Sequence, residues 1–316
     1  MEIGGYFDLE LAQGCNHLHE KAFASNTGRN ALELILRELK VQKILLPYFT
    51  CDVILEPIHK LSIEIEWYNI DENLELKDFF PNLRDEEFIL YTNYFGIKDR
   101  YISELSRIYQ NNLIIDNAQS LFSDQLHNIP TFYSPRKFLG IPDGGYAYIN
   151  KKINDMDYDI DYSYDRCLHL LKRLECDGSE GYADFKDNSI KLSKQPIKRM
   201  SELSKRMVAS ININKIKEKR IRNFSYLSNE LNSLNRLSLD VDSFAVPMVY
   251  PLLIEDDGFR EKLIKNRVFI ATYWPNVLSQ CDKGTLEYNL AKYILPLPID
   301  QRYGESEMAH IVSFFK

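Results

Sequence analysis

The sequence contains no apolar run that approaches the ~18 residues a helix needs to cross a membrane. Its N-terminus, "MEIGGYFDLEL", lacks the basic stretch followed by an apolar stretch that marks a secretory signal. Basic residues are not in excess either, because 39 Lys and Arg against 46 Asp and Glu give a net charge of −7. Non-specific nucleic-acid binding depends on a basic surface. The sequence therefore predicts neither a membrane nor a nucleic-acid partner.

The five cysteines are odd in number and widely scattered: Cys15, Cys51, Cys167, Cys176 and Cys281. This pattern is typical of reduced thiols in the cytoplasm, and it has no zinc-ligand spacing. The neighbouring pair His17 and His19 has no cysteine or carboxylate partner at a standard spacing, so no metal site is predicted.

The first half of the chain alternates between strand-like and helix-like segments. A chain of 316 residues suggests two domains, or one large α/β domain with a small appendage. The alternation predicts βαβ units and a mostly parallel central sheet flanked by helices. The expected strands lie in 43–47, 63–70, 86–96, 112–120 and 144–150, and the expected helices are 31–39, 51–61 and 102–111.

The second half has a different organisation. Residues 151–195 break the alternation: 154–167 are rich in acidic residues and tyrosine, and 176–189 have the pattern of a long loop. The segment is expected to be either a surface excursion or a lid over a substrate. Residues 199–235 have the pattern of one long polar helix. We therefore predict a large α/β domain over 1–225, which includes the excursion, and a small C-terminal α+β domain over 226–316.

Polar residues stand where the predicted strands end, and in parallel sheets ligands bind beyond the carboxyl ends of the strands. Asp116 ends the apolar strand "NLIID", where a bare carboxylate is costly to bury. It either caps the following turn or pairs with a cation at the strand tip. A protonated pyridine nitrogen is one such cation, and a carboxylate there would keep the ring an electron sink.

Two further segments have both an ordinary and a functional interpretation. "NTGRNAL" (26–32) is a glycine-containing turn that opens a helix, which is either a common capped helix or a phosphate site. Lys137 lies beside Arg136 and ahead of the apolar residues 138–139. It is either a solvated surface lysine, or an amine whose pKa is lowered by burial and by a neighbouring cation so that it can form a Schiff base.

Taken in order, these segments resemble the fold-type I pyridoxal-phosphate (PLP) enzymes, and most of all the DegT/DnrJ/EryC1/StrS family of sugar aminotransferases. "TGRNAL" matches the family's Ser-Gly-Thr-Ala-Ala-Leu turn, "LPYFTCDV" its Pro-x-x-Thr-aromatic segment and "IIDNAQS" its Asp-x-Ala-Gln motif. "YSPRKFLGIPDGG" has the family's seven-residue step from lysine to a Gly-Gly pair, "RMSEL" matches a helix start, and "LPID" a closing segment. The resemblance covers nearly the whole chain.

Position by position, the resemblance implies a set of PLP contacts. Lys137 would carry the cofactor as a Schiff base and then move protons, and Asp116 would pair with the pyridinium nitrogen. The other implied cofactor contacts are Gln119 near the phenolic oxygen, the backbone of Gly28, Arg29 and Asn30 at the phosphate, Ser134 as the serine nearest to the lysine, and Cys51 at the position of the family's ring-stacking aromatic residue.

The sequence departs from the family pattern at two phosphate contacts and at the stacking position. Phe132 stands where the family has a phosphate-binding serine, and Ile197 where the neighbouring subunit lends an asparagine. Tyr48 and Phe49 lie close in sequence to Cys51. We hypothesise that the Arg29 side chain compensates through a charge-assisted grip on the phosphate.

The resemblance implies a homodimeric PLP-dependent aminotransferase. Its substrate would be a nucleotide-linked keto-sugar, its amino donor an amino acid such as glutamate, and its product would feed a surface glycoconjugate. Two alternatives stay open. The family's sugar dehydratases replace the Schiff-base lysine with histidine, whereas this chain retains Lys137. A non-catalytic homologue would bind a sugar nucleotide or a partner protein. Tyr273 and Trp274 either line the site or belong to the core.

Overall fold

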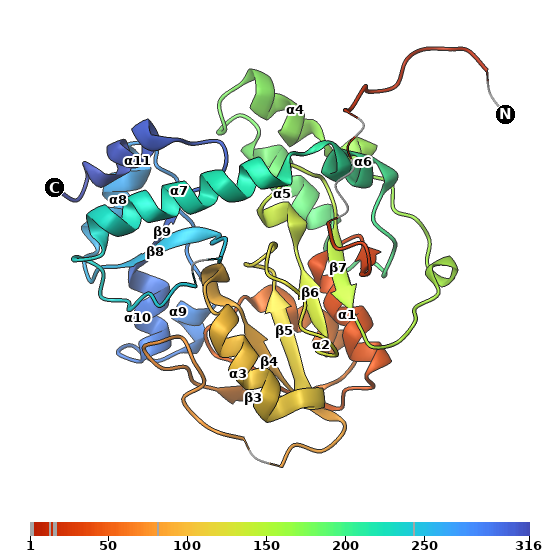
Figure 1. Cartoon of the computed structure of the whole chain (residues 1–316), viewed down its shortest axis with the longest axis horizontal. Coiled ribbons are helices and arrows are strands. Elements are labelled where there is room, and N and C mark those ends of the chain that lie inside the picture. The colour runs from red at the N-terminus through yellow and green to blue at the C-terminus, as the bar shows by residue number, and fades with distance from the viewer. Residues whose placement is uncertain (1–2, 13, 15–17, 81, 243) are drawn as a thin grey trace.

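The computed structural model describes residues 3–12, 14, 18–80, 82–242 and 244–316 (Figure 1). Its centre is a seven-stranded sheet with the strand order β1-β7-β6-β5-β4-β2-β3. Strands β2 to β6 run parallel, and β7 runs antiparallel to both β1 and β6. The mostly parallel sheet predicted from the sequence is confirmed. Its strands are β1 (Phe23–Ser25), β2 (Lys43–Pro47), β3 (Glu64–Tyr68), β4 (Glu87–Thr92), β5 (Leu113–Asn117), β6 (Thr131–Tyr133) and β7 (Gly145–Tyr148).

Helices cover both faces of this sheet, as a buried parallel sheet requires. Within the described residues the helices are α1 (Gly28–Glu38), α2 (Leu55–Lys60), α3 (Asp99–Tyr109), α4 (Leu168–Glu175), α5 (Tyr182–Lys191), α6 (Glu202–Ser210), α7 (Ile213–Leu231), α8 (Gly258–Lys265), α9 (Val277–Gln280), α10 (Leu286–Tyr293) and α11 (Glu305–Val312). None of these helices is long and apolar enough to cross a membrane.

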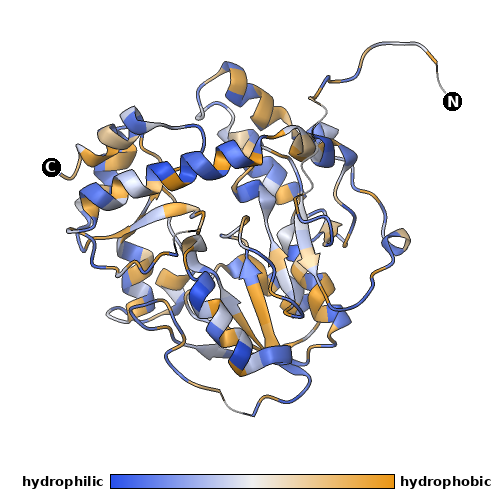
Figure 2. Cartoon of the chain, viewed as in Figure 1, coloured by the Kyte–Doolittle hydropathy of each residue, from blue (hydrophilic) through white to orange (hydrophobic). Residues whose placement is uncertain are grey.

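Side-chain alternation along the strands sorts the core into two layers. In β5, Ile114 packs with α1 and α2 on one face, whereas Leu113 and Ile115 pack with α3 and with the first half of α7 on the other. Figure 2 shows the apolar body of β5 and its polar tip, where Asp116 and Asn117 end the strand. The polar tip therefore lies at the carboxyl edge of a sheet that is otherwise fully covered.

A third core lies between β8 (Val249–Leu253), β9 (Ile294–Pro298) and the helices α7, α8 and α11. The two strands pair antiparallel as a separate sheet. Helix α7 crosses the molecule between the two parts (Figure 1). Ile216 in its first half packs in the large core, and Leu227 in its second half packs in the small one. The predicted domain boundary at 225/226 falls inside α7, and the division itself stays a prediction.

Two expectations for the second half were wrong. The pattern over 199–235 predicted one helix, but the structure breaks it into α6 and α7, because the Asn212 side chain accepts the Lys215 N–H and starts a new helix. The segment 176–189 was expected to be a long loop, but its second half lies in α5, and α4 directly precedes it. Their apolar residues include several that stay exposed, such as Leu171 and Leu174, so the pattern of a buried helical face is weak.

Candidate active site

Four strand ends and one helix start meet at the carboxyl edge of the large sheet. Asp116 ends β5, Asn93 follows β4, Cys51 follows β2, and Lys137 lies in the short turn after β6. The N-terminus of α1 reaches the same edge because β1 runs parallel to β6. The predicted gathering of polar residues at this edge is therefore present.

Asp116 is a buried carboxylate, 5% exposed, with one hydrogen bond from the Ala118 N–H at 2.7 Å. No ion pair joins it to a cation within the described part of the chain. Burial raises the pKa of its carboxyl above the ordinary value, and the positive charge of Lys137 and the Ala118 N–H oppose that rise. A buried acid in this state is suited to a cationic partner that arrives from outside the chain.

Lys137 lies in a short turn, Pro135–Lys137, directly after β6. Its positive charge acts on both Asp116 and the Cys51 thiol, opposing the rise that burial causes in the pKa of each, so the three groups share one site. Of the two interpretations of Lys137, the single chain has the exposed lysine: Phe138 and Leu139 are buried, but Lys137 itself is exposed.

The start of α1 has the geometry of an anion site. Thr27 caps the helix by accepting the Asn30 N–H at 3.0 Å, and the first intrahelical bond runs from the Ala31 N–H to the Thr27 carbonyl. The helix therefore leaves the N–H groups of Gly28 and Arg29 without an intrahelical partner, while that of Asn30 is already engaged. The Asn30 side chain is also occupied, since it donates to Asn26 Oδ1 and the Pro196 carbonyl.

Ser134 faces this helix start. A Cβ added to Gly28 would lie 3.2 Å from Ser134 Cβ and 3.4 Å from Ser134 Oγ. Gly28 therefore packs directly against Ser134, and the Ser134 hydroxyl lies beside the start of α1. Together they form a cradle in which the helix dipole, the first helix amides and the hydroxyl all favour an anion.

The Arg29 side chain is already engaged in an ion pair. Its Nη1 donates to Glu56 Oε2 at 2.7 Å, and Glu56 is held in turn by the Lys194 N–H and by Ser193 Oγ. This ion pair competes with the hypothesised grip of Arg29 on a phosphate. The amide of Arg29 is unaffected by the pair, so its predicted backbone contact stays a prediction.

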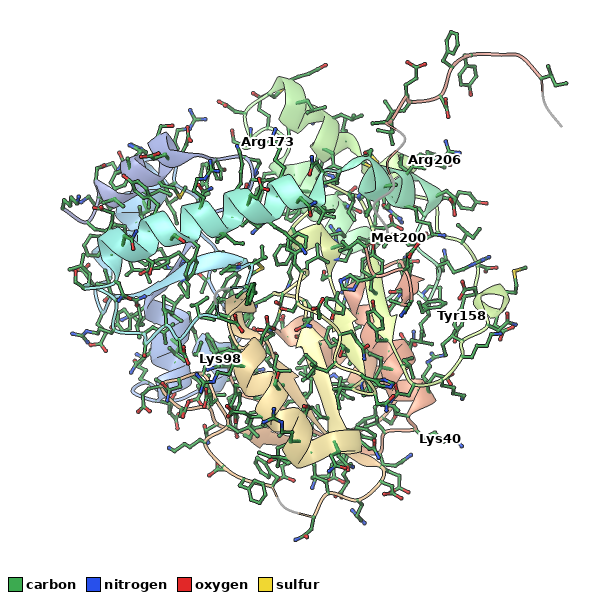
Figure 3. The ribbon with its side chains drawn as sticks, in the orientation of Figure 1. Lys40, Lys98, Tyr158, Arg173, Met200 and Arg206 are labelled. Atoms are coloured by element: carbon green, nitrogen blue, oxygen red, sulfur yellow. The ribbon has the colours of Figure 1, made fainter. Side chains whose placement is uncertain are left out.

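Both glycines of the Gly144-Gly145 pair are required by close approaches at the site. Gly144 has a φ of +134°, and an added Cβ would lie 2.7 Å from the Cε atom of Met200, which Figure 3 labels. A Cβ on Gly145 would lie 2.3 Å from the Thr27 carbonyl oxygen. The pair thus lets β7 pass directly beneath the start of α1, which explains its place in the motif.

Gln119 is held in one orientation with a free donor. Its Oε1 accepts the Phe95 N–H at 2.6 Å, which assigns the amide and directs Nε2 away. Nε2 is buried and has no hydrogen-bond partner within the described residues. A buried donor without a partner is costly. An acceptor such as a phenolic oxygen beside Asp116 and Lys137 would satisfy it, as the resemblance implied for Gln119.

The orientation of Gln119 depends on a contact that sequence reasoning missed. Phe95 adopts a left-handed backbone, with φ of +57°, and Gly96 follows with φ of +74°. A Cβ on Gly96 would lie 2.7 Å from the Gln119 carbonyl oxygen. The glycine after "NYF" was the available signal that backbone approaches backbone here.

Cys51 occupies the place where the family has an aromatic residue. Burial raises the pKa of its thiol, and it acts on the neighbouring Tyr273, whose pKa burial raises to about 12. Tyr48 and Phe49 do not fill that place. Tyr48 stacks on Trp67, and Phe49 packs against Tyr94 and Trp274. Tyr273 therefore lies by the site, whereas Trp274 belongs to the core.

Phe132 and Ile197 are both buried in the core layer that packs against α1. Neither can replace the polar phosphate contact that the family pattern has at its position.

Solved structures share this architecture. CalS13, a sugar aminotransferase from Micromonospora echinospora, superposes with a TM-score of 0.65 at 13% identity, over 94% of this chain and 87% of its own. A DegT DnrJ EryC1 StrS aminotransferase from Brucella abortus gives 0.61 at 14% identity, over 96% and 90%. The PLP form of Spr1654 from Streptococcus pneumoniae gives 0.62 at 15%, over 95% and 88%.

No protein-family model matches the chain, and neither does any curated protein. Identities of 13–15% over almost the whole length concern the fold. They confirm the fold class predicted from the motifs: the chain has the fold-type I architecture of these aminotransferases.

Proposed function

We propose that this protein is a PLP-dependent aminotransferase that aminates a nucleotide-linked keto-sugar, with an amino acid such as glutamate as donor. The observation that carries the proposal is the convergence of an exposed lysine, a buried carboxylate and a buried amide donor. Among the described residues the carboxylate has no ion-pair partner and the amide donor has no acceptor. Each of these three groups lacks a partner that PLP would provide. The fold shared with sugar aminotransferases supports the same conclusion.

The residues present fit the cofactor at both of its ends. Asp116 would hold the ring nitrogen in its protonated state, and Gln119 Nε2 would donate to the phenolic oxygen. The amides of Gly28 and Arg29, with Ser134 Oγ, would hold the phosphate. Bound PLP supplies an electron sink for the negative charge that develops at the donor's α-carbon.

The chain's own residues would carry out binding, orientation and proton movement. Lys137 would hold the cofactor covalently through Nζ. When an amino donor takes the place of Lys137, the freed Lys137 amine would carry a proton between the two carbon atoms that exchange it during the transfer. The ionised Asp116 carboxylate would preserve the ring's positive charge throughout. Tyr273 and Cys51 would border the face of the ring, where the usual aromatic residue is absent.

We further propose that two copies assemble around this site. Lys137 is exposed in the single chain, and an exposed nucleophile is poorly protected from water. A second copy placed over the edge of the sheet would exclude water and complete the substrate pocket. The four described cysteines are free thiols, which suits the reducing cytoplasm, where nucleotide sugars for glycoconjugates would be its substrates.

A non-catalytic homologue is the second candidate, and the burial of Phe132 and Ile197 favours it, because two polar phosphate contacts are lost. The two candidates differ in one measurement. Purified protein mixed with PLP should develop an absorbance band on the order of 410–430 nm, and glutamate should bleach it. No band at saturating PLP would reject the aminotransferase and leave the binder. A band that no amino acid bleaches would reject the donor half of the reaction.

The phosphate cradle gives a separate prediction. Gly28→Val should place a branched side chain between the α1 amides and Ser134, and weaken PLP binding by roughly tenfold or more through lost hydrogen bonds. Equilibrium dialysis of PLP against the variant measures this, and thermal unfolding of the apoprotein checks that the fold persists. An unchanged Kd would show that the phosphate does not bind at Gly28.

Arg29→Ala separates the amide of Arg29 from its side chain. Because the guanidinium is engaged by Glu56 and both partners are partly exposed, its loss should change the PLP Kd by no more than a few-fold. A loss as large as that of Gly28→Val would instead establish the hypothesised grip of the Arg29 side chain on the phosphate.

A further inference from the structure

Two cations of α7 lie over two aromatic rings that follow the proposed cofactor contacts. The Arg220 guanidinium lies over the Phe138 ring at 4.7 Å, and Phe138 directly follows Lys137. One helical turn earlier, the Lys217 ammonium lies 5.5 Å from the centre of the Phe122 ring, three residues after Gln119. The two rings meet edge to face at 5.5 Å. One face of α7 thus contacts both segments that bring residues to the site.

Arg220 is the better buried of the two cations, at 2% exposed. Its Nη1 donates to the carbonyls of Pro247 and Met248, at 3.3 and 3.0 Å, and its Nε has no hydrogen-bond partner among the described residues. The charge of the nearby Asp300 carboxylate also favours the cation. The contact with the Phe138 ring adds a cation–π attraction to these interactions.

A chain of short contacts continues from Arg220 to Gln119. The Met248 N–H donates to the Phe95 carbonyl at 2.8 Å, and the Phe95 N–H donates to Gln119 Oε1 at 2.6 Å. Gln119 and Lys137 lie on different loops, but both are connected to α7 by contacts of Arg220. The connection to Lys137 runs through Phe138, and the connection to Gln119 runs through Met248 and Phe95.

A second contact holds Phe138 from the small sheet's side. Gln301, in the loop between β9 and α11, donates its Nε2 to the Phe138 carbonyl at 2.8 Å. Arg220 therefore contacts the ring of Phe138 and Gln301 binds its carbonyl, although the two residues are 81 positions apart. The internal backbone bonds of the Lys137 turn are short-range, from the Lys137 N–H to the Ser134 carbonyl and from the Phe138 and Leu139 N–H groups to the Pro135 carbonyl. Burial of Phe138 and Leu139 in the large core holds the turn as well.

We propose that Arg220 is a positioning residue for Lys137. Arg220 on α7 contacts the Phe138 ring, Gln301 binds the Phe138 carbonyl, and together they set the direction of the lysine-bearing turn. The inference deepens the proposed function and rests on it for the role of Lys137. Because α7 joins the large and small cores, the position of the small core would then affect the position of the Lys137 amine.

The contacts of Arg220 and Gln301 with Phe138, which we call the clamp, can be tested by hydrogen exchange of the apoprotein without any cofactor. In Arg220→Met, the Phe138 and Leu139 amides should exchange faster by roughly tenfold, because the ring loses its cation while the turn's own bonds remain. Arg220→Lys should restore most of the protection, since an ammonium can still lie over the ring. Gln301→Met, which removes only the bond to the Phe138 carbonyl, should loosen the same peptide.

Two variants of α7 provide matched controls. Arg222→Met makes the same substitution at an exposed position two residues away. Leu231→Ala removes apolar contacts of the last residue of α7 with the small core, away from both Phe138 and the Gln301 loop. At an equal loss of Tm, Leu231→Ala should leave exchange at 134–140 unchanged. Equal loosening in Leu231→Ala, or none in Arg220→Met and Gln301→Met, would overturn the proposal.

Covalent PLP attachment separates the clamp from the proposed function. We expect Arg220→Met to retain bound PLP but to lower the fraction fixed by borohydride by several-fold, with partial rescue in Arg220→Lys. Normal fixation in Arg220→Met would overturn the positioning role while the proposed function stands. Faster exchange at 134–140 in Arg220→Met, together with a wild-type protein that fixes no PLP, would keep the clamp and reject the function.

Discussion

Lys137→Ala is expected to abolish amine transfer, with turnover lowered by roughly 10⁴-fold or more, because no other group at the site can hold the cofactor covalently and move the proton. The fold should persist, since Lys137 is exposed. Lys137→Arg should lose as much activity while keeping the positive charge beside Asp116. Steady-state kinetics with a keto-sugar nucleotide and glutamate measure the loss.

Lys152→Ala is a matched control for this prediction. Lys152 is another exposed lysine, just beyond β7, and its loss should leave turnover and Tm unchanged. Turnover of Lys137→Ala within tenfold of the wild type would contradict the role of Lys137, whatever the fold of the variant.

Asp116→Asn should stabilise the apoprotein and weaken the cofactor complex. Burial raises the pKa of Asp116 above its ordinary value of 3.8, so the native state holds its proton more tightly than the unfolded chain does. The free energy of unfolding of the wild type should therefore fall as the pH rises from about 4 through the raised pKa, and the asparagine variant should lack this loss. At pH 7 we expect the apo variant to be more stable, on the order of 1 kcal/mol.

The cofactor should reverse this order. Asparagine carries no charge to pair with a pyridinium, so the variant should lose roughly 100-fold in turnover and gain less Tm from added PLP than the wild type. Urea unfolding between pH 4 and 8, with and without PLP, measures both effects. An apo variant less stable than the wild type at pH 7 would show that the Asp116 carboxylate is satisfied within the chain, and would remove its assignment to the ring.

Much of the fold was predictable because local patterns decided it. The apolar segment at 43–47 is β2 with the predicted bounds, and Thr27 caps α1 as its sequence suggested. The break between α6 and α7 was missed, because the apolar pattern continues across it and only the capping role of Asn212 marks it. Very short strands such as β6, with three residues, are too short for any periodicity to show.

The sequence predicted which residues form the candidate site better than it predicted the residues with which they interact. Motif order identified Asp116, Gln119 and Lys137, but the pairing of Arg29 with Glu56 joins residues 27 positions apart and has no local signal. The clamp of Arg220 on Phe138 spans a still longer separation and depends on how α7 packs between two cores. Local sequence could not predict the exposure of Lys137, because tertiary packing determines where its turn points.

The most direct test is to locate the covalent attachment. Protein loaded with PLP is reduced with borohydride and digested, and mass spectrometry identifies the residue that carries the pyridoxyl group. We expect a single modified peptide over 132–149, with the group on Lys137 Nζ. Modification of another lysine, or none at saturating PLP, would contradict the assignment of this strand edge as the active site of an aminotransferase.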